Sequence, residues 1–197
     1  MSEKNKIVEK SDLISKEVYE KERKGYRKKL VEFKKKRRVP LGPYATFYFE
    51  NFQTILAQIQ EMLHIEKGGD AQLKDELEAY NPLIPKGKEL VATLMFEIDN
   101  PVSRAEFLGK VGGIENNVYI KVEGELIKAI PEKDLDRTSE EGKASSVQFV
   151  HFNFSDDQIN KFKKANSKVI IGIDHDLYNH STGILNETKN SLMNDFN

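Results

Sequence analysis

The spacing of apolar residues in the first third of the chain is that of an amphipathic helix. One stripe of a 3.6-residue period consists of Tyr19, Tyr26, Leu30 and Phe33, at i, i+7, i+11 and i+14. The pattern predicts a helix from Ser15 to about Arg37. Its stripe of aromatic and aliphatic side chains is expected to dock the helix on the rest of the protein.

A second helix is predicted after a short aromatic strand. Residues Tyr44–Phe49 read YATFYF, a composition typical of strands. Asn51 is placed to cap the helix that follows, which is expected to run to about Lys67. Its buried side is marked by Phe52, Ile55, Leu56, Ile59, Met62 and Leu63. A shorter helix is predicted over Ala71–Tyr80.

The second half of the chain alternates strand patterns with short helices. Strands are predicted over residues 89–98, 116–130 (a hairpin that turns at Gly124), 147–154 and 168–174, and helices over 101–111, 155–165 and 183–196, with a polar loop at 137–146. This order favours an α+β fold, with a mixed or antiparallel sheet in the second half, helices packed on it and a helix-rich N-terminal part. One domain is expected over residues 11–197, after a flexible stretch at 1–10. The core is expected to contain Phe52, Ile55, Ile59, Leu63, Phe96, Phe152 and Ile171.

Composition narrows the classes of function. The 197-residue chain has no cysteine, which excludes disulfides, iron–sulfur ligation by this chain, zinc–thiolate sites and a cysteine nucleophile. No stretch has the 18 or so apolar residues of a membrane span, and the N-terminus lacks the apolar core of a signal peptide. A cytoplasmic protein with no membrane segment is therefore expected.

Charge is distributed unevenly along the chain. The segment Lys24–Arg38, which includes Arg37, holds nine basic residues and one acid, Glu32, and so carries +8 in a chain whose net charge is −1. Such a segment attracts anions, nucleic acid or an acidic partner, or docks on the acidic remainder of its own fold. The apolar stripe in the same helix favours docking, so nucleic-acid binding through Arg37, Arg38 and their neighbours is not expected to be the main role.

The helix after Asn51 has no charged residue before Glu61, in a chain that is 32% charged. Two interpretations are open: the amide side of this helix is packed inside the domain, or it lines a pocket or partner surface. Glu61 and His64 also form a Glu-x-x-His pair, the spacing used in di-iron helical bundles. The other three histidines have no glutamate three residues before them, so no metal is assigned and the cofactor is left unknown.

Two further histidine regions are candidate sites. Asp174 and His175 follow a predicted buried strand, within GIDHDLYNH, where they could bind a ligand or simply close a turn. His151 lies on a predicted strand, as a core residue or, if the strands are neighbours, as part of an acid–imidazole–acid group with Glu97 and Asp174 that could transfer protons.

The segment GKASS offers a weaker candidate for anion binding. Lys143 and Ser145 could contact an anion, but the upstream glycine spacing of a phosphate loop is missing and the segment enters a strand. The chain also lacks a dinucleotide-binding glycine motif, a nucleophile elbow and a zinc-protease motif.

Several blocks, in order, resemble the domain-of-unknown-function family 3501: RRVPLGPYATFYFENFQTILAQIQEMLHIE, ELEAYNPLIPKGKELVATLMFE, GKASSVQFVHF and IGIDHDLY. The resemblance brings no established activity. It implies an uncharacterised bacterial protein, and association of such proteins with rubrerythrin-like proteins and iron–sulfur oxidoreductase subunits. It also implies that the position of His64 is usually basic, which makes His64 a poor shared ligand.

The sequence is therefore compatible with three functions. The first is an accessory or partner protein in redox metabolism, which rests on the resemblance alone. The second is a nucleic-acid- or anion-binding protein that uses Lys24–Arg38, and the third is an enzyme with a site around His175. Whether the chain forms a homo-oligomer is left open.

Overall fold

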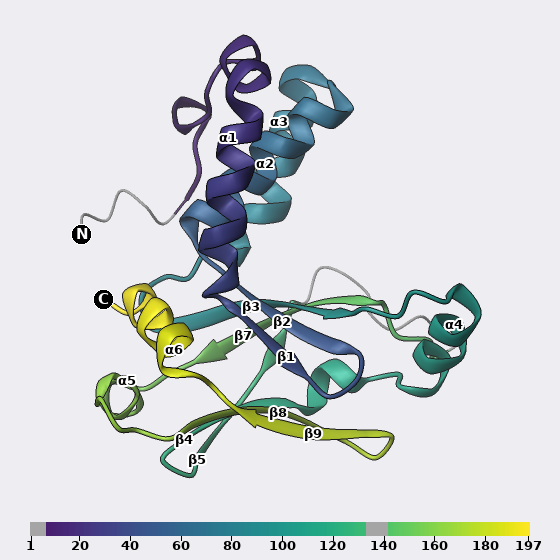
Figure 1. The fold of residues 1–197 in the computed structure, drawn as a ribbon, viewed down its shortest axis with the longest axis vertical. Coiled ribbons are helices and arrows are strands. Elements are labelled where there is room, and N and C mark those ends of the chain that lie inside the picture. Colours follow the sequence, from purple (N-terminus) through teal and green to yellow (C-terminus); the bar gives the residue numbers. More distant parts are fainter. Residues whose placement is uncertain (1–6, 133–141) are drawn as a thin grey trace.

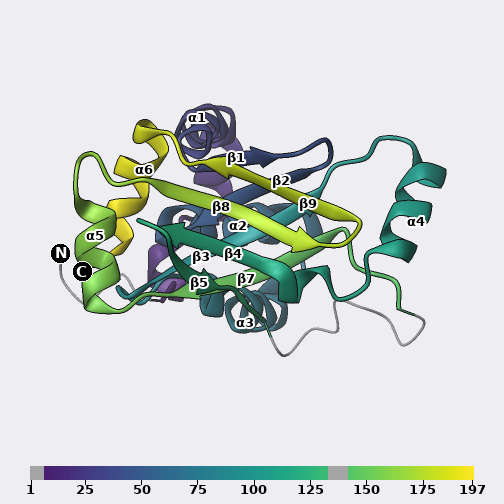
Figure 2. The ribbon, with the colours of Figure 1, turned by 90° about the horizontal axis from the view of Figure 1, so that it is seen from below.

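A computed structural model describes residues 7–132 and 142–197. Two antiparallel sheets pack face to face, and three helices stand on the outer face of the larger sheet (Figure 1). The view from below shows the smaller sheet in front of the larger one, with further helices at both ends of the sandwich (Figure 2). The α+β expectation is thus confirmed. Residues 1–6 and 133–141, which include the first half of the predicted loop at 137–146, lie outside the described residues.

The larger sheet has five strands in the order β1-β2-β3-β7-β6. Its strands are β1 (Arg38–Leu41), β2 (Ala45–Glu50), β3 (Glu89–Phe96), β7 (Val147–Asn153) and β6 (Ile130–Pro131). The central strand β3 is the predicted interior strand. It pairs antiparallel with β2 and with β7, which sets Val91 opposite His151.

The smaller sheet has four strands in the order β5-β4-β8-β9. Its strands are β5 (Glu125–Lys128), β4 (Val118–Val122), β8 (Val169–His175) and β9 (Tyr178–Gly183). The predicted hairpin at Gly124 is confirmed as β4–β5. Its turn residues Glu123 and Gly124 both have positive φ, at 50° and 84°.

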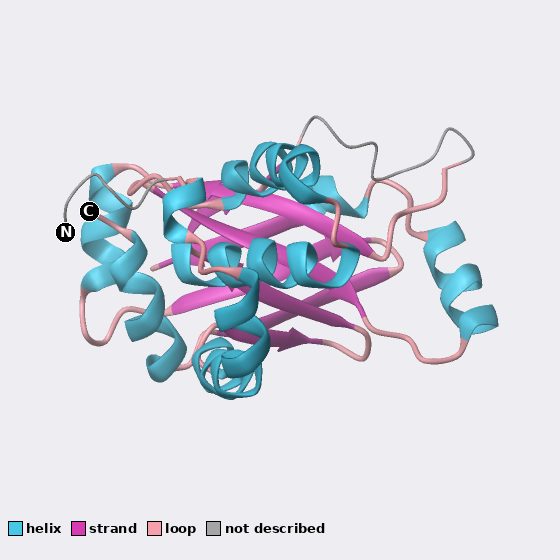
Figure 3. Cartoon of the chain, turned by 90° about the horizontal axis from the view of Figure 1, so that it is seen from above, coloured by secondary structure: helices cyan, strands magenta, loops and turns pink. Residues whose placement is uncertain are grey.

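The helices divide into a standing group and two groups at the ends of the sandwich. The standing group is α1 (Lys16–Lys35), α2 (Phe52–Glu66) and α3 (Gly69–Tyr80), and the end groups are α4 (Pro101–Lys110) on one side and α5 (Asp156–Lys163) with α6 (Asn186–Leu192) on the other. Figure 3 shows the standing group over the larger sheet. No helix within residues 7–132 and 142–197 has the length and apolarity needed to cross a membrane.

Two hydrophobic clusters follow from this arrangement. The larger cluster fills the space between the sheets and includes Phe96, Phe152 and Ile171, as expected. The smaller cluster lies between the standing helices and the outer face of the larger sheet, and Ile55 and Ile59 are buried there. Two residues expected in the core, Phe52 and Leu63, are only partly buried, because they lie near the two ends of α2 and pack against the margin of this cluster.

The start of α2 follows the sequence prediction. The Asn51 side chain accepts a hydrogen bond from the Thr54 amide at 3.1 Å, and the Thr54 hydroxyl accepts one from the Asn51 amide at 2.9 Å. This reciprocal cap satisfies two of the amides that a helix start leaves without partners. The helix ends at Glu66, because the left-handed φ of 58° at Lys67 breaks the helical repeat.

Two edge strands were not predicted. β1 begins at Arg38, where the sequence favoured the end of a helix and a turn, and its Pro40 is tolerated because β1 lies at the sheet edge. β9 covers the first residue of the predicted C-terminal helix, which begins only at Asn186. Ordered packing also starts within the expected flexible stretch, since Val8 is buried and its amide donates to Asn81 at 2.6 Å.

One close contact joins the two sheets, and another lies within the smaller sheet. The Tyr178 hydroxyl donates to the Leu41 carbonyl at 2.6 Å and accepts from the Ala45 amide at 2.9 Å, which ties β9 to the β1–β2 turn of the other sheet. Within the smaller sheet, Gly172 faces Tyr119, and a Cβ at position 172 would lie 2.5 Å from the tyrosine side chain. Because Gly172 has no side chain, the ring of Tyr119 can pack directly against the backbone of β8.

Candidate functional site

The basic segment lies mostly on α1, and most of its cations face solvent. Lys35 pairs within the helix with Glu32 at 2.7 Å, and Lys36 reaches Glu187 at 3.3 Å. In the part of the chain that the structure describes, Lys36 and Arg37 are the members of Lys24–Arg38 that form ion pairs outside the segment. Most charges of the segment thus lie on the exposed side of α1, and a largely uncompensated positive face remains.

Arg37 is not available to a ligand. Its side chain is 2% exposed and its guanidinium donates to the Phe49 carbonyl at 3.0 Å, the Glu50 carbonyl at 3.2 Å and the Asp195 carboxylate at 2.5 Å. Burial raises the pKa of Asp195 to about 6, although the charge of Arg37 opposes this shift. The structure gives Arg37 a role in joining the end of α1 to the C-terminal segment. Arg38, by contrast, is exposed on β1.

Glu61 is held by α1. Its carboxylate accepts from the Tyr19 hydroxyl at 2.6 Å and from Arg23 Nε at 3.1 Å, and a second Arg23 nitrogen completes a bidentate ion pair. Hydrogen bonding to Arg23, only partly opposed by burial, lowers the pKa of Glu61 to about 2. Burial and the bond to Glu61 raise the pKa of Tyr19 to about 12. Glu61 is thus a fixed anion that fastens α1 to α2.

His64 does not join Glu61 in a metal site. Its ring lies edge-on to Tyr19, with 5.6 Å between centroids, and its buried Nδ1 has no hydrogen-bond partner among the described residues. Nowhere in residues 7–132 and 142–197 do three histidine, cysteine, aspartate or glutamate side chains gather to hold a metal ion. The di-iron spacing noted in the sequence therefore has no counterpart in space.

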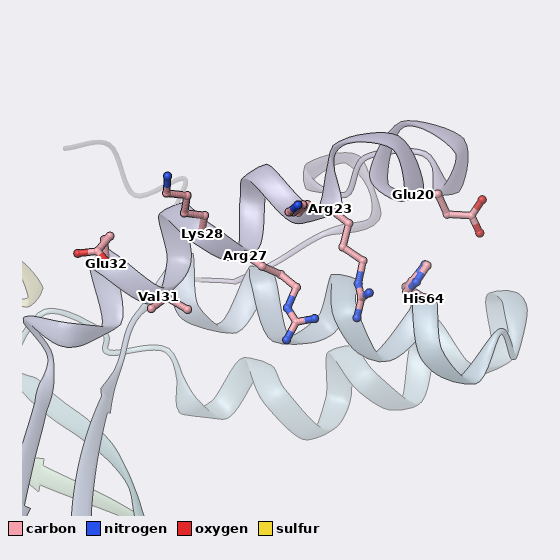
Figure 4. A pocket seen from close by; sticks show the side chains of 8 residues that line it. Glu20, Arg23, Arg27, Lys28, Val31, Glu32 and His64 are labelled. Carbon is pink, nitrogen blue, oxygen red and sulfur yellow. The ribbon is translucent and has the colours of Figure 1, made fainter.

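One side of α1 bounds a basic hollow of about 620 Å³ (Figure 4). It is lined by Glu20, Arg23, Lys24, Arg27, Lys28, Val31 and Glu32 of α1 and by His64 of α2. Figure 4 shows Arg23 and Arg27 extending from α1 toward α2, whereas Lys28 extends away. Four cations against two anions give this hollow a net attraction for anionic groups.

An apolar groove of about 650 Å³ lies between α1 and α2. The predicted stripe lines it with Tyr26, Leu30 and Phe33, and α2 contributes Leu56 and Ala57. The remaining lining is Asp12, Ile14, Tyr19, Arg27, Lys29, Gln53, Gln58, Gln60 and Glu61. The stripe is thus only partly used to dock the helix, and its Tyr26 is 41% exposed.

The uncharged side of α2 has two uses. The buried Gln60 accepts from the Ile14 amide at 3.0 Å and donates to the Ile14 carbonyl at 3.3 Å, which pins the chain before α1 onto α2. Gln53 and Ala57 instead line the groove, where Gln53 is exposed. One part of the amide side is therefore packed inside the domain, and another part lines a pocket, so each of the two interpretations holds for part of the helix.

His151 lies between two carboxylates, but they are not the predicted ones. Its Nδ1 is 3.1 Å from Glu89 and its Nε2 is 2.9 Å from Glu132. The proposed grouping with Glu97 and Asp174 is wrong, because β7 and the β8 that carries Asp174 belong to different sheets. Burial disfavours the charged imidazole, but hydrogen bonds and charges of Glu89 and Glu132 outweigh it and raise the pKa of His151. Both ring nitrogens face an acceptor, so the geometry holds an imidazolium rather than presenting a free base.

Glu97 makes different contacts. Its carboxylate accepts from the Thr46 hydroxyl at 2.7 Å and from the Tyr48 hydroxyl at 2.8 Å. Burial, together with the hydrogen bond to Glu97, raises the pKa of Tyr48 to about 12. These contacts fasten the end of β3 to β2.

The remaining candidates lie in local hydrogen bonds. His175 Nδ1 accepts from the Leu177 amide at 3.2 Å, in the turn between β8 and β9, and Asp174 accepts from Asn179 at 2.8 Å across the same hairpin. The Ser145 hydroxyl accepts from the Val147 amide at 3.2 Å at the start of β7, and Lys143 is exposed beside it. The structure does not bring these two pairs together with the α1–α2 surfaces.

Sequence comparison identifies the family of this chain. A family model described as "Protein of unknown function (DUF3501)" matches residues 7–196. The chain belongs to the DUF3501 family. A similar fold is seen in the crystal structure of a novel protein of unknown function from Burkholderia pseudomallei K96243, with a TM-score of 0.89. The two sequences are 36% identical, and the match covers 96% of this chain and 99% of that one. No curated protein matches the sequence.

Sequence reasoning missed the partners of His151 and the groove. Glu89 is 62 residues from His151 in the chain and meets it through the pairing of β3 with β7, which no local pattern specifies. Two features of the sequence could have indicated the groove. One is the long apolar stripe of α1, and the other is the absence of charged residues over the first nine positions of α2.

Proposed function

We propose that this DUF3501 protein is an accessory protein of cytoplasmic redox metabolism that docks on an acidic protein partner through the exposed basic face of α1. The observation that carries the docking surface is the positive charge of Lys24–Arg38, of which only Lys36 and Arg37 are ion-paired to the rest of the described chain. Uncompensated charge on one face speeds encounter with an opposite surface and selects against wrong partners. The redox setting is supported by the family resemblance alone.

Binding of a polyanion tests the docking surface. Fluorescein-labelled polyglutamate is titrated with the full chain and with the variant that combines Lys24→Gln, Lys28→Gln and Lys29→Gln. A control variant removes the same charge from the sandwich, at Lys110, Lys128 and Lys168, which are also exposed. We expect the α1 variant to bind about tenfold more weakly and the control to stay near the native affinity. Equal losses in both would show that α1 is not the docking face.

Cross-linking tests the redox setting. Lysine-reactive cross-linking in native cells, followed by mass spectrometry, is expected to join Lys24, Lys28 or Lys29 to a rubrerythrin-like protein or an iron–sulfur oxidoreductase subunit. The α1 variant should lose these cross-links. Cross-links from α1 to other proteins alone would leave the docking face in place and remove the redox assignment.

Nucleic acid is the second candidate, favoured by the row of exposed lysines along α1. Phosphate contacts from such a row would give binding without base specificity and with steep salt dependence.

A further inference from the structure

The groove between α1 and α2 has an apolar floor that the fold leaves open. Tyr26 is 41% exposed, and Leu30, Phe33, Leu56 and Ala57 are only half-buried. An aromatic and aliphatic stripe of this kind normally finds a cover within its own protein. Here the groove of about 650 Å³ is open on the surface of a chain that is otherwise rich in charges.

The charges around the groove favour an acidic occupant. Arg27 and Lys29 are both exposed and line it. Of its two anions, Glu61 is already bound by Tyr19 and Arg23, and Asp12 accepts the Glu9 amide at 2.9 Å. Asp12 keeps its negative charge, so Arg27 and Lys29 outnumber the one anion of the groove that is not ion-paired, and the basic hollow on the other side of α1 adds to this positive field.

The walls of the groove favour a helix over an extended segment. Both walls are helices, whose backbone amides are bonded within the helix, so an extended segment would find no strand edge to pair with. A helix satisfies its own backbone and needs only a side-chain surface. Tyr26, Leu30 and Phe33 follow one another at i, i+4 and i+7, the spacing at which an amphipathic helix presents its anchors.

We propose that the groove takes an amphipathic helix of the acidic partner, with the apolar stripe of that helix on Tyr26, Leu30, Phe33 and Ala57 and its acidic flank against Arg27 and Lys29. The proposal rests on the proposed function, to which it adds the form and chemistry of the partner segment. The uncharged stretch of α2 is then the surface against which this helix packs.

Filling the groove tests the proposal. The probe is a fluorescein-labelled helical peptide with leucine at i, i+4 and i+7 and glutamate on both flanks. The variant Ala57→Trp places a large ring in the groove, and Val102→Trp places the same ring on α4, away from the α1 docking face, where Val102 is 65% exposed. We expect Ala57→Trp to bind the peptide about tenfold more weakly and Val102→Trp to stay within about twofold of native. Equal peptide binding by the two variants would overturn the proposal that the groove is the binding site.

A second pair covers the case in which Ala57→Trp fails to fold, which circular dichroism would show. Lys29→Glu changes a groove residue, and Lys28→Glu changes its neighbour in the basic hollow. Lys29→Glu is expected to weaken peptide binding more strongly than Lys28→Glu, and the reverse order would overturn the proposal.

Comparing polyglutamate with the amphipathic peptide distinguishes failure of the groove proposal from failure of the proposed function. If the chain binds polyglutamate and binds the amphipathic peptide no better, the groove proposal fails and the proposed function stands. If neither probe binds, the proposed function fails as well.

Discussion

At the scale of single residues, two positively charged side chains lie inside this protein, and both are surrounded by hydrogen-bond acceptors. Arg37 is buried against three carbonyl groups and Asp195, and His151 is half-buried between Glu89 and Glu132. Both cations are matched by acceptors on each side of the charged group, which is the condition for burying a charge without a large penalty. Both residues therefore hold separate segments of the chain together.

The stability of the protein is expected to depend on pH through His151. Its folded pKa is raised above the free value of about 6.5, so the imidazolium stabilises the folded state fully below that pH. This contribution is lost as the pH rises through the folded pKa. Urea unfolding across this range should show that His151→Gln costs about 1–3 kcal/mol in acid and less in base. A cost that does not change with pH would contradict the charged state of His151.

At the scale of elements, the sequence predicts those helices and strands that have a long and regular hydrophobic pattern. The helices α1 and α2, the interior strand β3 and the hairpin β4–β5 have patterns long enough to be specific. The edge strands β1 and β9 do not, because an edge strand has fewer buried positions. β9 reads YNHSTG and is polar after Tyr178.

Contacts between strands lie beyond such patterns. The pairing that sets His151 near Glu89 depends on the register of β3 against β7, and the separation of β7 from β8 into two sheets depends on the whole sandwich. The sequence therefore offered an acid–imidazole–acid group around His151 only as an alternative to a core residue, and it named Glu97 and Asp174 where the structure has Glu89 and Glu132. The groove depends likewise on how α1 crosses α2, for which the sequence supplied the surfaces but not their exposure.

The hairpin β8–β9 gives a direct test of the His175 site. Because His175 accepts the Leu177 amide in the turn, His175→Ala is expected to lower the unfolding free energy by about 0.5–1.5 kcal/mol and to lower the melting temperature. Asp176→Ala, in an exposed residue of the same turn, is the control. Elemental analysis of native-purified protein accompanies the melting curves. Metal found in the wild type and lost from a His175→Ala variant of unchanged melting temperature would instead support a ligand site.

At the scale of the whole molecule, positive charge is concentrated in one segment, at the end of α1 and the start of β1, while the net negative charge is spread over the rest of the chain. Lys24–Arg38 carries +8 and the remainder of the chain −9. We expect one cooperative folding unit over residues 11–197, because Arg37 and Asp195, 158 positions apart in the chain, form a buried ion pair. The positive face of α1 then works as a fixed part of the molecule and not as a loose tail.

Nucleic-acid binding is expected to be weak. Part of the basic segment is already engaged, since Lys35 pairs with Glu32 and Lys36 with Glu187. Fluorescence anisotropy with duplex DNA and single-stranded RNA should show no micromolar binding at physiological salt. Micromolar binding that is lost when Lys34, Lys35 and Lys36 are changed to glutamine would reverse this assignment and favour the second candidate function.

The contact between Gly172 and Tyr119 has a consequence for the history of the family. A side chain at position 172 needs the space that the tyrosine side chain fills, 2.5 Å from where its Cβ would be. Lys121 rests on the same ring, with its Nζ 5.0 Å from the ring centre, so moving the ring also disturbs the neighbouring strand position. Substitutions at 119 and 172 are thus tolerated mainly as a pair, and aligned relatives should show glycine at 172 wherever 119 is aromatic and covariation elsewhere.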